Sequence, residues 1–235
     1  MVKHMPESIE WVKARPVAHR GLHDLGAGVP ENSLAAFAKA AEAGYPVELD
    51  VRLLGDGQPA VFHDETLERL TGAEGALASL DAAGAKALRL GGTDERIPLL
   101  GEALETLAGR VPVFVELKNP DGAGPLEEAV WGLLAAYGGA FAVESFNPAS
   151  LQWFLANAPR AVRGQLVSEG DHLAERMPLS QAHFLACRFD RLPHPAVAKY
   201  RQEGLPVLGW TTRSPKDHAQ AMRHCDNVVF EGYQP

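Results

Sequence analysis

The chain has 235 residues, of which 46% are hydrophobic and 22% are charged, a composition typical of soluble globular proteins. Its net charge of -8 argues against bulk electrostatic binding to nucleic acid or to an anionic membrane. No run approaches the ~20 apolar residues of a membrane span, and the N-terminal stretch lacks the apolar core of a signal peptide. The two cysteines, Cys187 and Cys225, have no metal-ligand spacing and read as free thiols. We therefore expect a cytoplasmic protein without stable membrane insertion.

Short β-branched apolar runs alternate along the chain with alanine-rich amphipathic runs. The expected strands lie at 16–19, 47–51, 111–117, 141–146, 161–167, 183–189, 206–210 and 227–230. The expected helices lie at 32–44, 99–108, 125–137, 148–157, 171–177, 195–203 and 215–224. Eight such units predict an α/β fold, a (β/α)8 TIM barrel forming one domain over residues 1–235.

Two features refine this prediction. No glycine-rich phosphate loop follows the first strand, which disfavours an open doubly wound sheet. Residues 64–98 fit neither repeating pattern, so we expect a small insertion after the second strand, with a short helix near 79–88. In the first helix, Asn32 or Ser33 is a suitable N-cap and Gly44 a suitable stop.

The second strand, "VELDV", carries two acids inside an apolar run. Side chains alternate along a strand, so Glu48 and Asp50 share the interior face of the barrel and stand ~7 Å apart. Buried without partners, two such carboxylates would repel each other. A bound Ca²⁺ or Mg²⁺ would remove the conflict, because both cations prefer oxygen ligands. A salt bridge to Arg52, or an exposed edge, is the structural alternative.

The following "GDGQ" contains a strong hairpin signal at Asp56-Gly57. A two-residue turn there makes Asp50 face His63, and directly opposed residues project to the same side. The hairpin thus predicts a histidine beside the acidic pair and makes "PAVF" a ninth strand candidate. The alternative is that His63 is a surface turn residue.

Two further strand ends repeat this pattern. In "VPVFVELKN", Glu116 and Lys118 share the interior face, where Lys118 either holds an anion or neutralises Glu116. The first strand ends in "VAHRG", which places His19 and Arg20 at the barrel mouth, where active sites of this fold lie. Together these residues could cleave a phosphodiester: acids hold a metal, cations stabilise charge, and two histidines transfer protons.

At these residues the sequence resembles the glycerophosphodiester phosphodiesterase family. The resemblance rests on "HRG" at 19–21, "PENSLAAF" at 30–37, "ELDVRLLGDGQPAVFHD" at 48–64, "IPLLGEAL" at 97–104, "VELK" at 115–118, "SFNP" at 145–148 and "GWTTR" at 209–213. It implies a TIM barrel that hydrolyses small-molecule glycerophosphodiesters to sn-glycerol 3-phosphate and an alcohol.

The resemblance also implies roles for individual residues. One Mg²⁺ or Ca²⁺ would be held by Glu48, Asp50 and Glu116. His19 and His63 would act as general base and general acid. Arg20 and Lys118 would hold the phosphate, and Trp210 would line the glycerol end of the pocket. Trp210 could equally be barrel packing.

The sequence departs from the family pattern at two rim positions. Arg213 stands where the family usually has asparagine, and Glu231 where it usually has aspartate, which leaves the preferred alcohol open. Glu31 either touches the site or starts a helix, where its charge is favoured.

Three other functions remain as alternatives. A lysophospholipase D or sphingomyelinase D-like enzyme would need an apolar approach, and no amphipathic membrane-binding segment is evident. A non-catalytic phosphate-ester-binding barrel should lack a histidine or a metal acid, and the sequence keeps all of them. A metal-dependent carbohydrate isomerase would not require two rim histidines beside Arg20.

Overall fold

The computed structural model describes residues 9–119, 122–169 and 172–235. Within these ranges, eight parallel strands close into a barrel, and β9 pairs back onto β1. In barrel order the strands are β1 (Val17–Ala18), β2 (Val47–Leu53), β4 (Val113–Leu117), β5 (Phe141–Ser145), β6 (Val162–Val167), β7 (Phe184–Arg188), β8 (Val207–Thr212) and β9 (Asn227–Phe230). The predicted TIM barrel is therefore confirmed.

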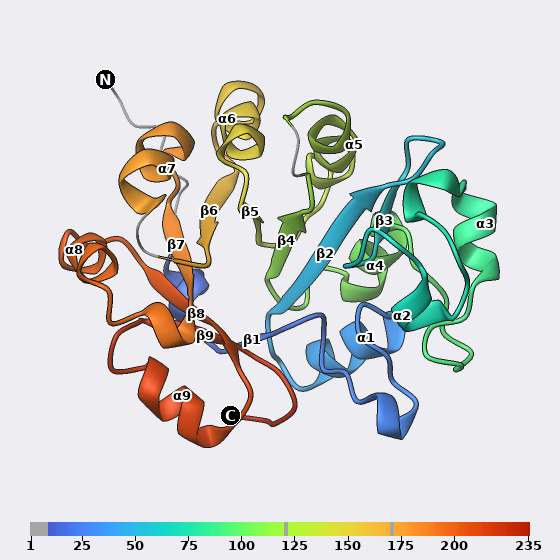
Figure 1. The fold of residues 1–235 in the computed structure, drawn as a ribbon, viewed down its shortest axis with the longest axis horizontal. Coiled ribbons are helices and arrows are strands. Elements are labelled where there is room, and N and C mark those ends of the chain that lie inside the picture. Colours follow the sequence, from blue (N-terminus) through green and yellow to red (C-terminus); the bar gives the residue numbers. More distant parts are fainter. Residues whose placement is uncertain (1–8, 120–121, 170–171) are drawn as a thin grey trace.

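Helices follow the strands around the outside of the barrel (Figure 1). They are α1 (Leu34–Glu42), α4 (Leu100–Leu107), α5 (Pro125–Leu134), α6 (Pro148–Asn157), α7 (Leu173–Ser180), α8 (Pro195–Gln202) and α9 (Pro215–Ala221). Four of them begin at a proline, a residue whose fixed φ suits the first helical position. In α1 the cap is Ser33, whose hydroxyl accepts from the Ala36 N–H, so Asn32 is free for another role.

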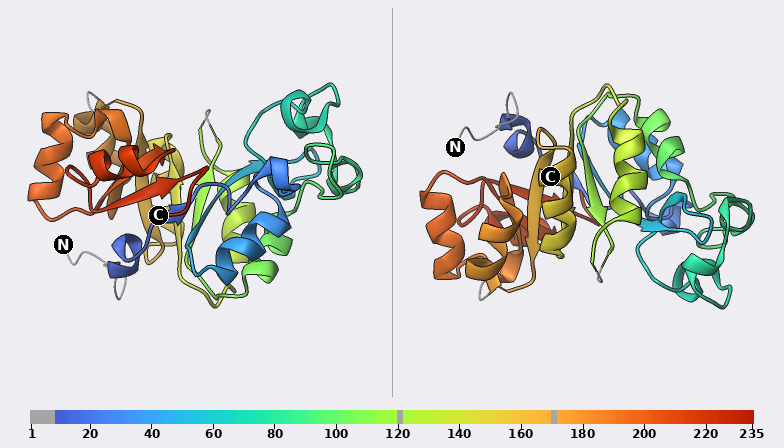
Figure 2. Two further views of the ribbon diagram at one scale, coloured as in Figure 1. Left: turned by 90° about the horizontal axis from the view of Figure 1, so that it is seen from below. Right: turned by 90° about the horizontal axis from the view of Figure 1, so that it is seen from above.

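The insertion follows the second barrel strand and stands away from the ring of helices (Figures 1 and 2). It contains α2 (Glu68–Thr71), the 3-10 helix η3 (Leu77–Ser79) and α3 (Ala82–Ala87). Its apolar side chains form a separate cluster that includes Phe62, Leu67 and Leu70. The predicted short helix near 79–88 is α3, whereas α2 was not expected from the sequence.

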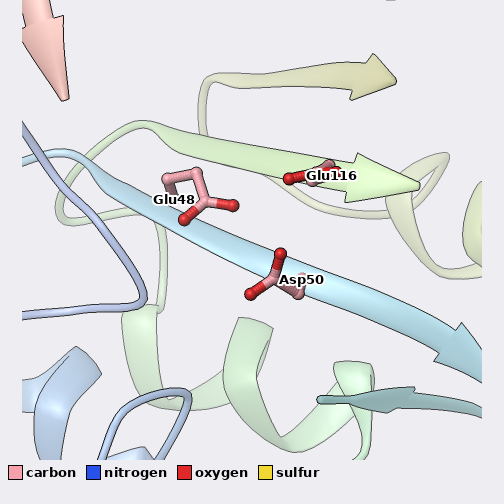
Figure 3. A group of neighbouring side chains, drawn as sticks. All are labelled: Glu48, Asp50 and Glu116. Atoms are coloured by element: carbon pink, nitrogen blue, oxygen red, sulfur yellow. The ribbon is translucent and has the colours of Figure 1, made fainter. Parts of the chain in front are cut away.

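The alternation of side chains along β2 divides two packing regions. Val47, Leu49 and Val51 are fully buried against the surrounding helices, as predicted. Glu48 and Asp50 point to the opposite, interior side (Figure 3). The lower interior is packed by a different apolar cluster that includes Phe114, Phe184 and Leu208, so the barrel is filled below its polar mouth. No helix within the described ranges is long and apolar enough to cross a membrane.

The hairpin after β2 forms, but its predicted register is wrong by one residue. Strand β3 (Pro59–Val61) pairs antiparallel with β2, and Val51 lies opposite Val61. The turn has three residues, because the Leu54 N–H donates to the Gln58 carbonyl at 2.9 Å and Gly57 takes φ +83°. The Phe62 N–H consequently donates to the Asp50 carbonyl, and His63 lies one residue beyond that contact rather than opposite Asp50.

Candidate active site

A pocket opens at the carboxyl ends of the barrel strands, where this fold carries its active sites. Seven of the eight predicted site residues line it: His19, Arg20, Glu48, His63, Glu116, Lys118 and Trp210. The eighth, Asp50, is fully buried and makes ion pairs with two of the lining residues. Despite the shifted hairpin, the structure thus brings the whole predicted set to one end of the barrel.

Three carboxylates form the centre of the site (Figure 3). Asp50 on β2 lies beside Glu116 on β4 in the strand register, and Glu48 precedes Asp50 by two positions. One oxygen from each of the three lies within 4.8 Å of the others, and all three residues are buried. Like charges this close destabilise one another, so the cluster needs positive charge.

The pKa values reflect this crowding. Burial, and then the charges of Asp50 and Glu116, hold the pKa of Glu48 well above its usual range. Burial also raises the pKa of Glu116 to about 7, although the Lys118 ammonium opposes that shift. Asp50 behaves differently, because Lys118 and Arg20 outweigh its burial and keep its pKa well below normal. At neutral pH the existing cations therefore stabilise Asp50 more than they stabilise Glu48.

The donor set fits a hard divalent cation. Carboxylate oxygens are the ligands that Ca²⁺ and Mg²⁺ prefer. The Oε1 atom of Glu48 is buried and accepts no hydrogen bond from the described residues, which leaves it available as a ligand. The other oxygen of Glu48 accepts from the Arg20 backbone N–H at 3.0 Å, which fixes the carboxylate. The structural alternative, a salt bridge from the acids of β2 to Arg52, does not occur among the described residues: Arg52 Nε donates to the His63 carbonyl at 2.7 Å, and Nη1 lies 3.6 Å from Glu65 Oε1.

Two cations flank the carboxylates. The Nε of Arg20 lies 3.0 Å from Asp50 Oδ2, and Lys118 Nζ lies 3.0 Å from Asp50 Oδ1 and 2.6 Å from Glu116 Oε1. Arg20 has φ +55°, and the next residue, Gly21, has φ +82°. A Cβ at position 21 would lie 2.8 Å from that of Ala36, so only glycine fits this sharp exit from β1.

Each of the two predicted histidines is held by a carboxylate through Nδ1. His19 Nδ1 lies 2.5 Å from Glu231 Oε2, and His63 Nδ1 lies 2.7 Å from Asp64 Oδ1. The pKa of Glu231 falls to about 2 because the contacts with His19 and Arg213 outweigh its burial, so Glu231 is an acceptor and His19 Nδ1 the donor. The His19 Nε2 atom lies 3.9 Å from Glu48 Oε2, beside the carboxylate cluster.

Trp210 lies on β8 in the wall of the pocket. Its ring packs edge-on against Phe146, with centroids 5.6 Å apart. Its Nε1 is buried and donates to no described residue. The predicted barrel-packing role is thus present, and the same ring also faces the pocket.

Sequence reasoning missed several residues of the site. Asn32, expected as a possible helix cap, donates from Nδ2 to Asp50 Oδ2 at 2.8 Å. Glu144 on β5 lies beside Glu116 in the register and lines the pocket, and burial raises its pKa to about 8. An acid at the interior position of "FAVESF" was the available signal for Glu144. Asp64 directly follows His63, but nothing local shows that it holds the imidazole.

Comparisons with known proteins agree with this geometry. The sequence model of the glycerophosphoryl diester phosphodiesterase family matches residues 19–230. The glycerophosphodiester phosphodiesterase of Caldanaerobacter subterraneus subsp. tengcongensis is 32% identical over 221 residues, which are 88% of each chain.

Two solved structures are also similar. The phosphodiesterase of Oleispira antarctica, in complex with the product sn-glycerol-3-phosphate, superposes with a TM-score of 0.82 at 28% identity and 92% coverage of each chain. The glycerophosphodiester phosphodiesterase of Thermotoga maritima gives 0.73 at 27% identity, covering 92% of this chain and 94% of that one. With the family match spanning nearly the whole barrel, the chain belongs to the glycerophosphoryl diester phosphodiesterase family.

Proposed function

We propose that this protein hydrolyses glycerophosphodiesters to sn-glycerol 3-phosphate and an alcohol with the help of one Mg²⁺ or Ca²⁺. The observation that carries this proposal is the cluster of three buried carboxylates beside two histidines whose Nδ1 atoms are held by other carboxylates. The product bound to the Oleispira antarctica phosphodiesterase supports the choice of sn-glycerol 3-phosphate.

Glu48, Asp50 and Glu116 would hold the cation, whose contribution when bound is to withdraw charge from the phosphoryl oxygens. Arg20 and Lys118 line the same pocket and would donate hydrogen bonds to those oxygens. In the structure both side chains form ion pairs with Asp50. When the substrate binds, Arg20 and Lys118 would donate hydrogen bonds to its phosphate as well as to the Asp50 carboxylate.

His19 would act as general base and His63 as general acid. Burial lowers the pKa of both imidazoles, and their carboxylate partners only partly oppose this, so both are largely neutral at pH 7. A neutral His19 can take at Nε2 the proton of the attacking hydroxyl, which belongs either to water or to the substrate's own glycerol, while the new P–O bond forms. In the second case water must then open the cyclic phosphate to give sn-glycerol 3-phosphate. The anionic phosphate of the substrate would favour the protonated form of His63, which would give its proton to the leaving oxygen as the old P–O bond breaks. Trp210 would pack against the apolar edge of the glycerol.

The assay is release of sn-glycerol 3-phosphate from glycerophosphocholine after EDTA treatment, with Mg²⁺ or Ca²⁺ added back. We expect activity to return with at least one ion. His19→Ala and His63→Ala should each lower kcat by about 10²- to 10⁴-fold, the usual contribution of a positioned acid or base. His172→Ala, at an exposed histidine, is the matched control and should keep the wild-type rate.

Two outcomes would contradict the proposal. If no ion supports release from glycerophosphocholine or from several other glycerophosphodiesters, the hydrolase reaction itself is wrong. If either histidine variant retains the wild-type kcat, the assignment of that residue is wrong.

We also propose a reducing, cytoplasmic location, which the two buried free thiols Cys187 and Cys225 support.

A further inference from the structure

Arg69, on α2 of the insertion, binds two separate carboxylates at the barrel mouth. Its Nε donates to Asp64 Oδ2 at 2.5 Å. Its Nη1 and Nη2 donate to the two oxygens of Glu31 at 2.9 and 2.7 Å. The planar fork of arginine allows such a three-point contact, which a lysine ammonium cannot reproduce with the same geometry.

Both carboxylates support residues of the proposed reaction. Asp64 Oδ1 contacts His63 Nδ1 at 2.7 Å, and Glu31 Oε1 accepts from Arg20 Nη1 at 2.6 Å. His63 follows β3 and Arg20 follows β1, so they lie on different segments of the chain. Contacts between the side chains of Asp64, Arg69 and Glu31 connect them. Arg69 thereby connects the support of the general acid to the support of the phosphate-binding arginine.

Electrostatics favour the charged forms of Arg69 and of the two carboxylates that it contacts. Burial raises the pKa of Glu31, but the hydrogen bonds from Arg69 and the charge of Arg20 outweigh it, so the net shift is downward. The same balance, with Arg69 and His63 as the partners, lowers the pKa of Asp64. An isolated exposed ion pair contributes little to the stability of a protein. The bidentate contact between Arg69 and Glu31 belongs to a network of charges, which holds the side chains in place better than a single pair does.

The insertion has its own packing, which fixes the backbone of Arg69. Leu67 and Leu70, on either side of it, are 2% and 6% exposed in the insertion's apolar cluster. Phe62, next to His63, belongs to the same cluster. The turn after α2 is closed by the Gly75 N–H, which donates to Glu68 Oε1 at 3.0 Å. The packing of the insertion therefore holds the backbone that carries Arg69.

We propose that Arg69 is a positioning residue: by clamping Asp64 and Glu31 together, it sets His63 and Arg20 in register around the substrate phosphate. The inference rests on the proposed function, because it is the phosphodiester reaction that needs both groups aligned. It assigns the insertion a part in that reaction, with Arg69 acting on the substrate only through other side chains.

The test compares Arg69→Ala and Arg69→Lys with Arg89→Ala. Arg89 lies in the same insertion, where it pairs with the exposed Asp94 and donates to the Thr93 carbonyl. Within the described ranges it forms no hydrogen bond or ion pair with Asp64, Glu31 or His63, so it is the matched control. We expect Arg69→Ala to lower kcat on glycerophosphocholine by about 10- to 100-fold, as loss of an outer support usually does, with a smaller change in KM. Arg69→Lys should recover only part of the loss, and Arg89→Ala should match wild type in kcat and thermal midpoint.

A double variant shows whether Arg69 acts through its partner. If it does, the loss of activity in Asp64→Asn/Arg69→Ala should be smaller than the product of the two single losses, because both changes disturb the same Asp64–His63 contact while only Arg69→Ala also releases Glu31. The ¹⁵N signals of the His63 imidazole, assigned by their loss in His63→Ala, should shift in Arg69→Ala and stay in place in Arg89→Ala. This readout needs no turnover.

The possible failures are distinguishable. An inactive wild type overturns the proposed function and this inference with it. An active wild type whose Arg69→Ala variant keeps its kcat and its His63 signals overturns the positioning role alone. Fully multiplicative losses in the double variant would also overturn it, since they would mean that Arg69 and Asp64 act independently.

Discussion

Glu144 offers a sharp test of the electrostatics of the site. It is 3% exposed on β5, and its Oε2 accepts no hydrogen bond from the described residues. Burial, together with the neighbouring charge of Glu116, raises its pKa to about 8, against a usual 4.5. Glutamine keeps the shape of the protonated carboxyl but cannot ionise. We therefore predict that Glu144→Gln stabilises the metal-free protein at alkaline pH.

The sign follows from the two pKa values. Below pH 4.5 the carboxyl is protonated in both the folded and unfolded states, so it contributes no pH dependence. Between pH 4.5 and 8 the unfolded chain loses this proton and the folded protein keeps it, so the free energy of unfolding falls as pH rises. Each pH unit in this window is worth about 1.4 kcal/mol, and the whole window on the order of 4 kcal/mol.

The assay is urea denaturation in EDTA at pH 5 and pH 8.5, so that no cation neutralises the cluster. Between the two pH values, the free energy of unfolding should fall more for the wild type than for Glu144→Gln, by on the order of 4 kcal/mol. Glu105→Gln, at an exposed glutamate of α4, is the control and should follow wild type. Equal pH slopes for wild type and Glu144→Gln would refute the reasoning, because the buried carboxyl would then ionise without penalty.

Three further predictions concern the mouth and the barrel interior. Glu231→Gln removes the charged partner of His19 and should lower kcat by about 10- to 100-fold with little change in thermal midpoint. Steady-state kinetics and melting curves measure the two quantities. An unchanged kcat would contradict the orienting role of Glu231. Trp210→Ala should lower kcat/KM about tenfold, mainly through KM, if the ring packs against substrate, whereas a change in stability alone would favour a packing role. Gly164→Ala should destabilise the fold by about 1–3 kcal/mol in urea titrations, because a Cβ there would lie 2.1 Å from the Phe184 ring; a wild-type midpoint would show that the interior can repack.

The sequence by itself determined the barrel and most of its active-site set. Alternating apolar runs fix which strand faces meet the helices, so the interior position of Glu48, Asp50 and Glu116 follows from local periodicity. In parallel strands the carboxyl ends gather at one side, which brings His19 and Lys118 to the same mouth. These conclusions need only the order of the strands and the alternation of side chains along each.

The tertiary structure decided what depends on contacts between distant segments. Residues 55–57 form a three-residue turn, where the Asp56-Gly57 signal predicted two residues. The length of the turn depends on the register between β2 and β3, which the hydrogen bonds between the strands fix. No periodic pattern in the sequence predicts the pairing of His19 with Glu231, which are 212 residues apart, or of Arg69 with Glu31, which are 38 apart. Such contacts arise only once barrel closure and the packing of the insertion have fixed where each backbone segment lies.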